Sequence, residues 1–365
     1  MTKDHLFQDA RIVRILIERL QAAALRLPRR ITLMEVCGTH THAIGAAGLR
    51  RLLPEEIRLV SGPGCPVCVT PVGYLDHAEA LAADPDTVLC TFGDLYRVPS
   101  SRSSLEAAAA AGARVRIVYA ADDALEFARE HPGLRVVFLA IGFETTAPTI
   151  AAALAKAEDA GIPNFQILPG NKRVAPALAA LATDPAARLD GFLLPGHVSV
   201  ITGSRCYAFL SEQHRLPAVV AGFTAADILR AVLALVEMVA AGRPALLNLY
   251  GRVVTEQGNR IAQELIERFF EPADAVWRGL GNIPGSGLAL RAPWTGRNAA
   301  ASPVELPPPS EPPGCRCGEV LAGRMDPPEC PLFARACTPD SPVGACMVSS
   351  EGSCAAWYRH ERRAR

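Results

Sequence analysis

Apolar residues recur in short runs along the first 221 residues, and each run ends in glycine or in a turn sequence. Eight of these runs have the length of strands: residues 31–36, 57–60, 87–92, 115–119, 136–141, 165–168, 191–194 and 218–221. Because most positions within a run are apolar, without a polar alternation, they predict strands of parallel sheets covered on both faces. The pattern therefore predicts an α/β fold.

Helical spacing of apolar residues marks the segments around and between these runs. The predicted helices are residues 11–27, 73–83, 104–111, 122–130, 148–160, 175–182, 228–241 and 256–269. Two smaller α/β units fit the chain length better than one large sheet, with a boundary near residues 131–133. We therefore expect two related, Rossmann-like parallel-sheet domains, 1–131 and 132–225. Residues 226–365 would form a helical segment, a proline-rich arm and a small cysteine-rich domain.

Length and charge narrow the class of protein. A chain of 365 residues predicts two or three domains. Lys and Arg number 37 and so do Asp and Glu, which argues against a nucleic-acid or anionic-membrane partner. No signal peptide or membrane-spanning run is recognisable in the sequence. We expect a cytoplasmic protein.

Eleven cysteines fall mainly into two groups, one near the N-terminus and one between residues 315 and 354. Clustered cysteines in a chain without an export signal are more typical of metal ligands or catalytic thiols than of structural disulfides. Two separate thiol sites are the simplest interpretation.

The N-terminal group combines Cys37, in Cys-Gly-Thr-His, with Cys65 and Cys68, in Cys-Pro-Val-Cys. The C-x-x-C pair suits a redox-active dithiol or an iron site, half of a zinc site, or a structural turn with incidental thiols. A zinc site would need further ligands from Cys37, His40 or His42. His40, three residues after Cys37, could lower the pKa of that thiol or hydrogen-bond a metal's outer ligands.

These motifs follow predicted strands, where the loops of open α/β sheets collect functional groups, so they could face one cleft. Glu144, in Gly-Phe-Glu-Thr-Thr-Ala-Pro, follows the fifth strand. It could perform chemistry, or it could stabilise the start of a helix capped by Thr145 or Thr146. Both interpretations remain open.

The C-terminal group contains four cysteines with 14, 6 and 16 residues between them: Cys315, Cys330, Cys337 and Cys354. They suit a [4Fe-4S] cluster or an all-cysteine zinc site, and the absence of paired C-x-x-C knuckles favours iron-sulfur. Cys317 and Cys346 are additional thiols, and Cys317 could replace Cys315 as a ligand. No P-loop, complete dinucleotide fingerprint or serine-nucleophile elbow occurs.

Four motifs together resemble the HypD family of [NiFe]-hydrogenase maturation factors. They are residues 34–42 (Met-Glu-Val-Cys-Gly-Thr-His-Thr-His), 61–71 (Ser-Gly-Pro-Gly-Cys-Pro-Val-Cys-Val-Thr-Pro), 142–148 (Gly-Phe-Glu-Thr-Thr-Ala-Pro) and 342–352 (Pro-Val-Gly-Ala-Cys-Met-Val-Ser-Ser-Glu-Gly). The resemblance runs from about residue 30 to the C-terminus.

This resemblance implies a scaffold for assembling the Fe(CN)2(CO) unit of the hydrogenase active site. It implies that Cys37 binds the iron, with a second thiolate from a small HypC-type partner, and that a HypE-type protein donates cyanide. Cys65 and Cys68 would do redox work or contact the iron, with His40 and Glu144 as further candidates for chemistry. Cys315, Cys330, Cys337 and Cys354 would hold a [4Fe-4S] cluster in a third domain.

Two other functions fit some of the same residues. A stand-alone thiol-disulfide oxidoreductase would use the cluster with Cys65 and Cys68, but it would not need a third thiol beside two histidines. A zinc-stabilised interaction protein would use the cysteines for structure alone. The favoured hypothesis is a redox-active assembly scaffold rather than a conventional turnover enzyme.

Overall fold

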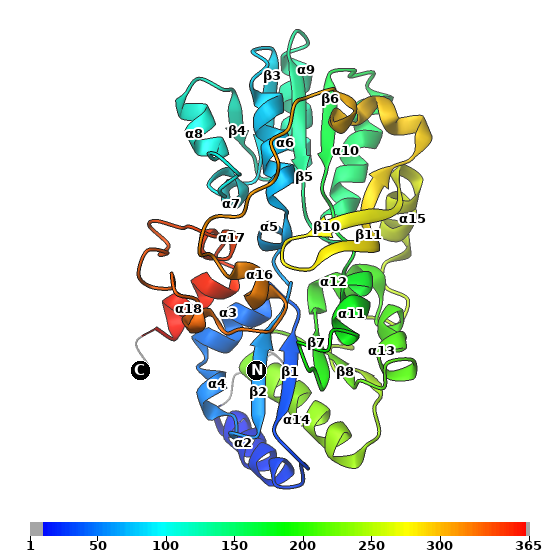
Figure 1. Ribbon diagram of the computed structural model, residues 1–365. Helices are drawn as coiled ribbons and strands as arrows, with labels where there is room; N and C mark the ends of the chain where they lie inside the picture. The colour runs from blue at the N-terminus through cyan, green and yellow to red at the C-terminus, as the bar shows by residue number, and fades with distance from the viewer. Residues whose placement is uncertain (1–9, 363–365) are drawn as a thin grey trace.

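The computed structural model describes residues 10–362. Two parallel sheets lie one above the other, and an antiparallel hairpin and the C-terminal segment lie between them (Figure 1). Sheet A has the strand order β2-β1-β7-β8-β9, and sheet B has the order β4-β3-β5-β6. The predicted fold class, two parallel-sheet α/β units and a cysteine-rich region, is confirmed.

All eight predicted strands are present, and three more follow them. The strands are β1 (Ile31–Glu35), β2 (Ile57–Ser61), β3 (Thr87–Thr91), β4 (Val115–Ile117), β5 (Arg135–Ala140), β6 (Phe165–Pro169), β7 (Gly191–Leu194), β8 (Ala218–Val220), β9 (Leu246–Asn248), β10 (Phe270–Trp277) and β11 (Gly281–Leu290). The central strands β3 and β7 are buried throughout, as continuous apolar runs predict for strands covered on both faces.

The sheets divide the chain differently from the predicted boundary near residue 131. β3 and β4 precede that point and β5 and β6 follow it, yet all four pair in sheet B. Sheet A takes β1 and β2 from before sheet B in the chain and β7, β8 and β9 from after it. Sheet B is thus inserted into the unit built on sheet A. An apolar run marks a strand but not its partner, which is why the predicted boundary is wrong.

Helices cover both sheets. They are α2 (Ala10–Ala24), α3 (Gly38–Ala46), α4 (Leu49–Leu52), α5 (Pro66–Val69), α6 (Val72–Ala82), α7 (Gly93–Tyr96), α8 (Leu105–Ala110), α9 (Ala121–Glu130), α10 (Ala147–Asp159), α11 (Val174–Ala182), α12 (Gly196–Thr202), α13 (Ala208–Glu212), α14 (Ala225–Ala241), α15 (Arg260–Phe269), α16 (Cys317–Leu321), α17 (Ala345–Val348) and α18 (Ser353–His360). Thr224 caps the start of α14 through its side chain, and Gly242 ends it in the left-handed conformation. No helix within residues 10–362 is long and apolar enough to cross a membrane.

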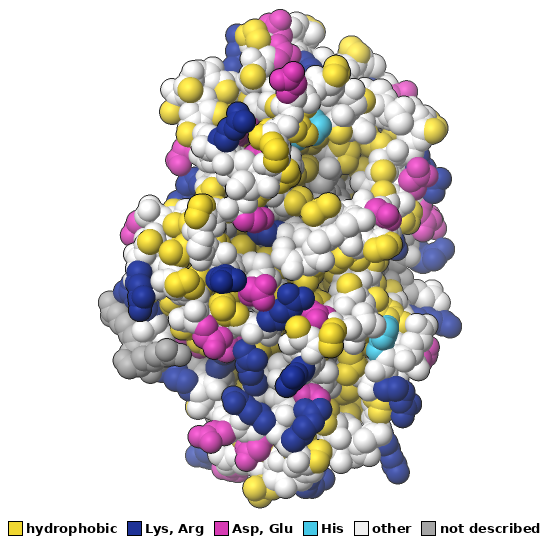
Figure 2. Space-filling view, viewed as in Figure 1, with side chains coloured by type: hydrophobic (Ala, Val, Ile, Leu, Met, Phe, Trp, Pro, Cys, Tyr) yellow, Lys and Arg dark blue, Asp and Glu magenta, His cyan; other side chains and the backbone are white. Residues whose placement is uncertain are grey.

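A shared hydrophobic core joins the two sheets to the cysteine-rich segment. It includes Met34 of sheet A, Leu139 of sheet B and Val69 of α5. Cys317, Cys346 and Cys354 belong to the same core. The C-terminal segment is therefore packed into the body of the molecule. Basic and acidic side chains are interspersed over the face in Figure 2, with Lys and Arg more frequent over the lower half.

Candidate functional site

The loops after β1 and β2 meet backbone to backbone. Cys37 immediately precedes α3 with extended backbone, and Gly38 N donates to Gly64 O at 3.1 Å. A Cβ on Gly64 would overlap the backbone of Cys37. Glycine at this position therefore permits the Cys37 loop to lie directly against the loop that carries Cys65 and Cys68.

A buried carboxyl group fixes the position of Cys37. Glu35 Oε2 accepts from Cys37 N at 3.2 Å, and Glu35 Oε1 accepts from Thr41 Oγ1 at 2.5 Å. Burial raises the pKa of Glu35 to about 7. The Cys37 side chain is itself 8% exposed, and burial raises its pKa to about 11. The free thiol is therefore protonated at neutral pH, and it would lose its proton on binding a metal.

His40 does not lie in solvent beside the thiol but is buried against another loop. Its Nε2 lies 2.9 Å from Gly222 O, and its Nδ1 is buried without a hydrogen-bond partner among the described residues. Burial lowers the pKa of His40 to about 4, so the ring is neutral. Phe223 lies between His40 and His197, with ring centroids 4.7 Å and 4.1 Å away, respectively.

His42 faces the C-terminal helix. Its Nε2 lies 3.2 Å from Nε2 of His360 in α18, and the two rings meet edge to face. This pair joins the helix after Cys37 to the end of the cysteine-rich segment. His42 thus has a packing and hydrogen-bonding role here.

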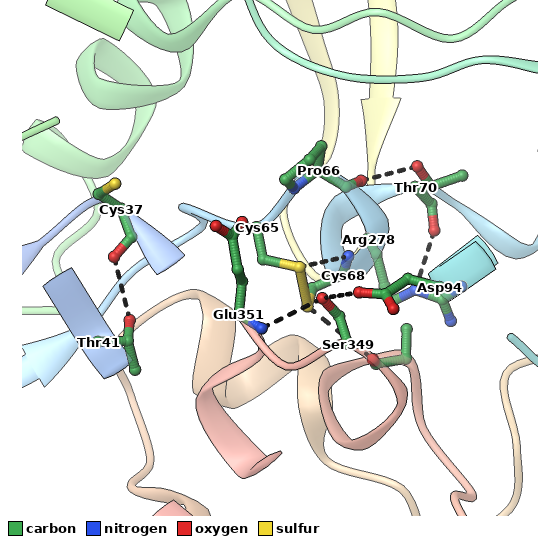
Figure 3. Close-up of a disulfide and its surroundings, with 11 residues drawn as sticks. Cys37, Thr41, Cys65, Pro66, Cys68, Thr70, Asp94, Arg278, Ser349 and Glu351 are labelled. Carbon is green, nitrogen blue, oxygen red and sulfur yellow. Dashed lines mark hydrogen bonds between the residues drawn. A yellow bond between two sulfur atoms is a disulfide. The ribbon is translucent and has the colours of Figure 1, made fainter. Parts of the chain in front are cut away.

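Cys65 and Cys68 form a disulfide at the start of α5 (Figure 3). Cys65 is the N-cap residue, and its sulfur accepts from Cys68 N at 3.2 Å. Cys68 Sγ lies 3.9 Å from Ala345 O, at the start of α17. The sulfur of Cys37 points away from the disulfide in this view. The Cys37 loop and the loop of Cys65 and Cys68 are thus in contact through their backbones, but the sulfur of Cys37 and the disulfide have different surroundings.

The segment around Glu351 closes over this region. Thr39 Oγ1 donates to Glu351 Oε1 at 3.2 Å, and a Cβ on Gly38 would overlap Glu351. Ser349 Oγ donates to Asp94 Oδ2 at 2.7 Å and thereby ties the same segment to α7. Burial is the main cause that raises the pKa of Cys37, and the negative charge of Glu351 adds to it. Burial lowers the pKa of His197, and the charge of Glu351 partly offsets this effect.

Sequence reasoning assigned no role to Glu351 or to His197. Glu351 is 312 residues from Thr39 in sequence, so no local pattern indicates that they touch. His197 was visible as the end of a Pro-Gly-His motif after the seventh strand. That position was the only sequence signal that could have placed it near the thiol site.

Glu144 lies apart from the thiols. Its Oε1 accepts from Val174 N at 3.0 Å, at the first residue of α11, and its Oε2 is buried without a partner among the described residues. Burial raises the pKa of Glu144 to about 7, and its charge contributes to raising the pKa of Cys206 and of Tyr207. Glu144 thus binds the start of α11 and not of the helix that follows it in the chain. That helix, α10, begins after Thr146, whose side chain makes no capping hydrogen bond.

The C-terminal cysteines gather around one cavity. All six of them line it: Cys315, Cys317, Cys330, Cys337, Cys346 and Cys354. The predicted ligands therefore come together, and so do the two additional thiols. Gly344 lies so close to Cys315 that a Cβ there would overlap its sulfur. Hydrogen bonding to Cys317, burial and the charge of Cys317 raise the pKa of Cys315.

This donor set is one that an iron-sulfur cluster or an all-cysteine zinc site uses. Within residues 10–362, no three His, Cys, Asp or Glu side chains are arranged to hold one metal ion. The four thiolates of a [4Fe-4S] cluster each bind a different iron, so they need to surround a cavity rather than converge on one point. Apolar walls from Leu332, Phe333 and Met347 also enclose the sulfurs.

Comparison with known proteins identifies the family. A sequence model of the HypD family, described as hydrogenase formation hypA family, matches residues 11–361. The chain is 44% identical to hydrogenase expression/formation protein HupD of Azotobacter chroococcum mcd 1, over 98% of this chain and 96% of that protein. It is 43% identical to hydrogenase maturation factor HypD of Escherichia coli (strain K12), with the same coverage. For HypD of Rhizobium leguminosarum bv. viciae the identity is 45%, over 94% and 91%.

These matches span both sheets, the hairpin and the cysteine-rich segment. They confirm the resemblance carried by the four motifs. The chain belongs to the HypD family of hydrogenase maturation factors.

Proposed function

We propose that this protein is the scaffold on which the Fe(CN)2(CO) unit of the [NiFe]-hydrogenase active site is assembled. Cys37 holds the iron as a thiolate, a small HypC-type partner supplies a second thiolate, and a HypE-type protein donates cyanide. The observation that carries the proposal is a third, buried thiol, Cys37, packed by backbone contact against the loop of the Cys65–Cys68 disulfide.

The surroundings of Cys37 suit a metal rather than a free nucleophile. With a pKa of about 11, its thiol is not reactive by itself at neutral pH. A bound iron ion would displace the proton, and the thiolate would then be held in place by the contact of its backbone with Glu35. Cyanide and carbon monoxide favour low-spin iron(II), which a soft thiolate ligand suits.

Cys315, Cys330, Cys337 and Cys354 would hold a [4Fe-4S] cluster, which supplies single electrons when bound. Cys317 and Cys346 line the same cavity. Ala345, the residue before Cys346, contacts Cys68 through its carbonyl oxygen. Opening the Cys65–Cys68 disulfide takes two electrons and two protons and leaves two thiols. We propose that the two thiol sites are coupled through this contact.

The central test removes the Cys37 sulfur. We expect Cys37→Ala to lose the infrared cyanide and carbonyl bands of the bound iron unit and to retain the visible absorbance of the C-terminal centre. The matched control is Cys90→Ala, which removes another buried thiol, in β3. If Cys37→Ala keeps the cyanide and carbonyl bands with the same intensity per protein as wild type, Cys37 is not the residue that binds the iron.

A stand-alone thiol-disulfide oxidoreductase is the second candidate, because the structure contains the Cys65–Cys68 disulfide. The same Cys37→Ala variant separates the two functions. An oxidoreductase keeps its disulfide-exchange rate without Cys37 and loses it in Cys65→Ser. Zinc without acid-labile sulfide in anaerobically purified protein would instead favour a zinc-stabilised interaction protein.

A further inference from the structure

We infer that Arg278 is the fixed positive charge that stabilises the reduced state of the centre held by the C-terminal cysteines. Arg278 directly follows β10 and binds the end of the disulfide helix α5, and the next residue, Gly279, contacts Gly318 of the cysteine-rich segment. This role makes it a positioning residue that acts through the centre. The inference rests on the proposed function, which places a redox centre in that cavity.

Arg278 is anchored to the helix that carries the disulfide. Its backbone N donates to Val69 O at 2.9 Å, and its Nε donates to Thr70 O at 3.0 Å. These two carbonyl groups belong to the last residue of α5 and to the residue after it. Figure 3 shows the bond to Thr70. The guanidinium group therefore cannot move without disturbing α5.

The turn that carries Arg278 also packs against the cysteine-rich segment. Gly279 has a φ of +80°, and a Cβ there would overlap the backbone of Gly318. Gly318 directly follows Cys317. The turn is thus packed between α5 and the residue that follows Cys317, so Arg278 lies one residue from the contact with the cysteine-rich segment.

The positive charge of Arg278 is only partly compensated. The residue is 3% exposed, and its Nη1 pairs with Glu311, whose side chain is 51% exposed. Its Nη2 is buried and has no hydrogen-bond partner among residues 10–362. A buried N–H without a partner is unfavourable, and an anionic sulfur would satisfy it well.

Electrostatics gives the sign of the effect. Four thiolates around an iron-sulfur centre leave it net negative, and each added electron makes it more so. Net charge, hydrogen bonds to the sulfurs and exposure set the reduction potential of such centres. A buried cation beside the sulfurs stabilises the more negative, reduced state and therefore raises the potential.

The test is a redox titration of the full-length, anaerobically purified protein, with dithionite as reductant and mediator dyes, followed by electron paramagnetic resonance. We expect that, at a fixed potential, Arg278→Gln has a ratio of reduced to oxidised centre about tenfold lower than wild type. For a one-electron couple this is a downward shift of about 59 mV. Arg278→Lys keeps the charge and should recover most of the wild-type potential.

A second variant tests the same charge without touching Arg278. Glu311→Gln removes the partly exposed counter-ion, so the potential should rise rather than fall. Arg297→Gln is the matched control, because Arg297 is also largely buried and binds backbone carbonyl groups and Glu158, in contact with β6 and α10. It should leave the potential unchanged.

Two results would overturn the inference, and they are distinguishable. If the centre is present and neither Arg278→Gln nor Glu311→Gln moves its potential in the expected direction, Arg278 has no electrostatic role and the proposed function still stands. If the wild-type protein contains neither iron nor acid-labile sulfide in the C-terminal segment, the proposed centre fails together with the inference.

Discussion

At the scale of single residues, the thiol site depends on two glycines that allow close packing. Gly64 lets the loop after β2 touch the backbone of Cys37, and Gly38 leaves room for Glu351. Neither glycine has a positive φ, so other residues could adopt the same backbone conformation. Glycine is needed at these positions because there is no space for a side chain. A side chain at either position must push two functional loops apart.

We therefore expect Gly64→Ala to lower the free energy of unfolding by about 2 kcal/mol or more, because an overpacked contact has to shift the backbone. Urea denaturation measures the change. Gly133→Ala is the control, because a Cβ on Gly133 meets no atom within 4 Å. Equal stability of the two variants would show that the loops separate freely.

Glu144 makes stability depend on pH. Burial raises its pKa from 4.5 to about 7, so the folded protein keeps a proton that the unfolded chain loses. Linkage then requires stability to fall as pH rises through this window. The full effect of this one carboxyl group is on the order of 3 kcal/mol.

We expect Glu144→Gln, which cannot ionise, to remove that part of the difference in stability between pH 5 and pH 8. Urea denaturation at the two pH values, compared with wild type, measures it. Glu264→Gln, at an exposed position of α15, should leave the difference unchanged. A Glu144→Gln variant with the wild-type pH dependence would mean that the carboxyl is not the source.

The candidate site was predictable from sequence in part. Cys37, Cys65 and Cys68 each follow a strand of the same sheet, and this position alone predicted that their loops meet. Glu351 reaches Thr39 only because the C-terminal segment folds back over α3, and nothing near either residue in the sequence indicates that contact. Whether His40 and Glu144 take part in chemistry stays a prediction.

At the scale of elements, the eight strands up to residue 221 were found from sequence, and β9, β10 and β11 were not. β10 and β11 contain Pro272, Pro284 and several glycines, residues that are typical of turns rather than of strands. A two-stranded antiparallel ribbon at the surface tolerates them, and its pairing shifts register between Ala273 and Ala275. The turn of this hairpin carries Arg278, so the missed element is also the one that links the two thiol sites.

The contact between α3 and α18 should weaken in acid. Burial, with the charges of His42 and Arg359, lowers the pKa of His360. The stability that this group contributes is therefore lost as pH falls below about 6.5, the ordinary value for histidine. We expect the protection of the amides of residues 353–360, which is the exchange rate of an unstructured chain at the same pH divided by the observed rate, to fall several-fold between pH 7.5 and pH 5.5.

His360→Gln should reduce this pH dependence, because glutamine does not gain a charge next to His42. His131→Gln is the control, at an exposed histidine after α9. Exchange in α18 that is equally pH-dependent in wild type and in His360→Gln would exclude the histidine pair as its cause.

At the scale of the whole molecule, the fold class and the eight strands up to residue 221 were predictable, and the strand order was not. The pairing of β1 with β7 joins residues about 160 apart in the chain, and no repeat or spacing in the sequence reveals it. The two sheets therefore alternate along the chain in an order that only the folded structure shows.

This inserted arrangement has a consequence for the order in which the protein folds during synthesis. Sheet B is continuous in the chain and is complete once residue 169 has left the ribosome, whereas sheet A waits for β9 at residues 246–248. Until β7 at residues 191–194 has been made, β1 lacks its neighbour on one side. Until residues 345–351 have been made, the loops of Cys37, Cys65 and Cys68 lack the segment that packs against them. The nascent chain thus has three exposed thiols for the time it takes to synthesise most of the protein. During this period, oxidation or binding of an unintended metal ion would trap the chain before the thiol site has formed.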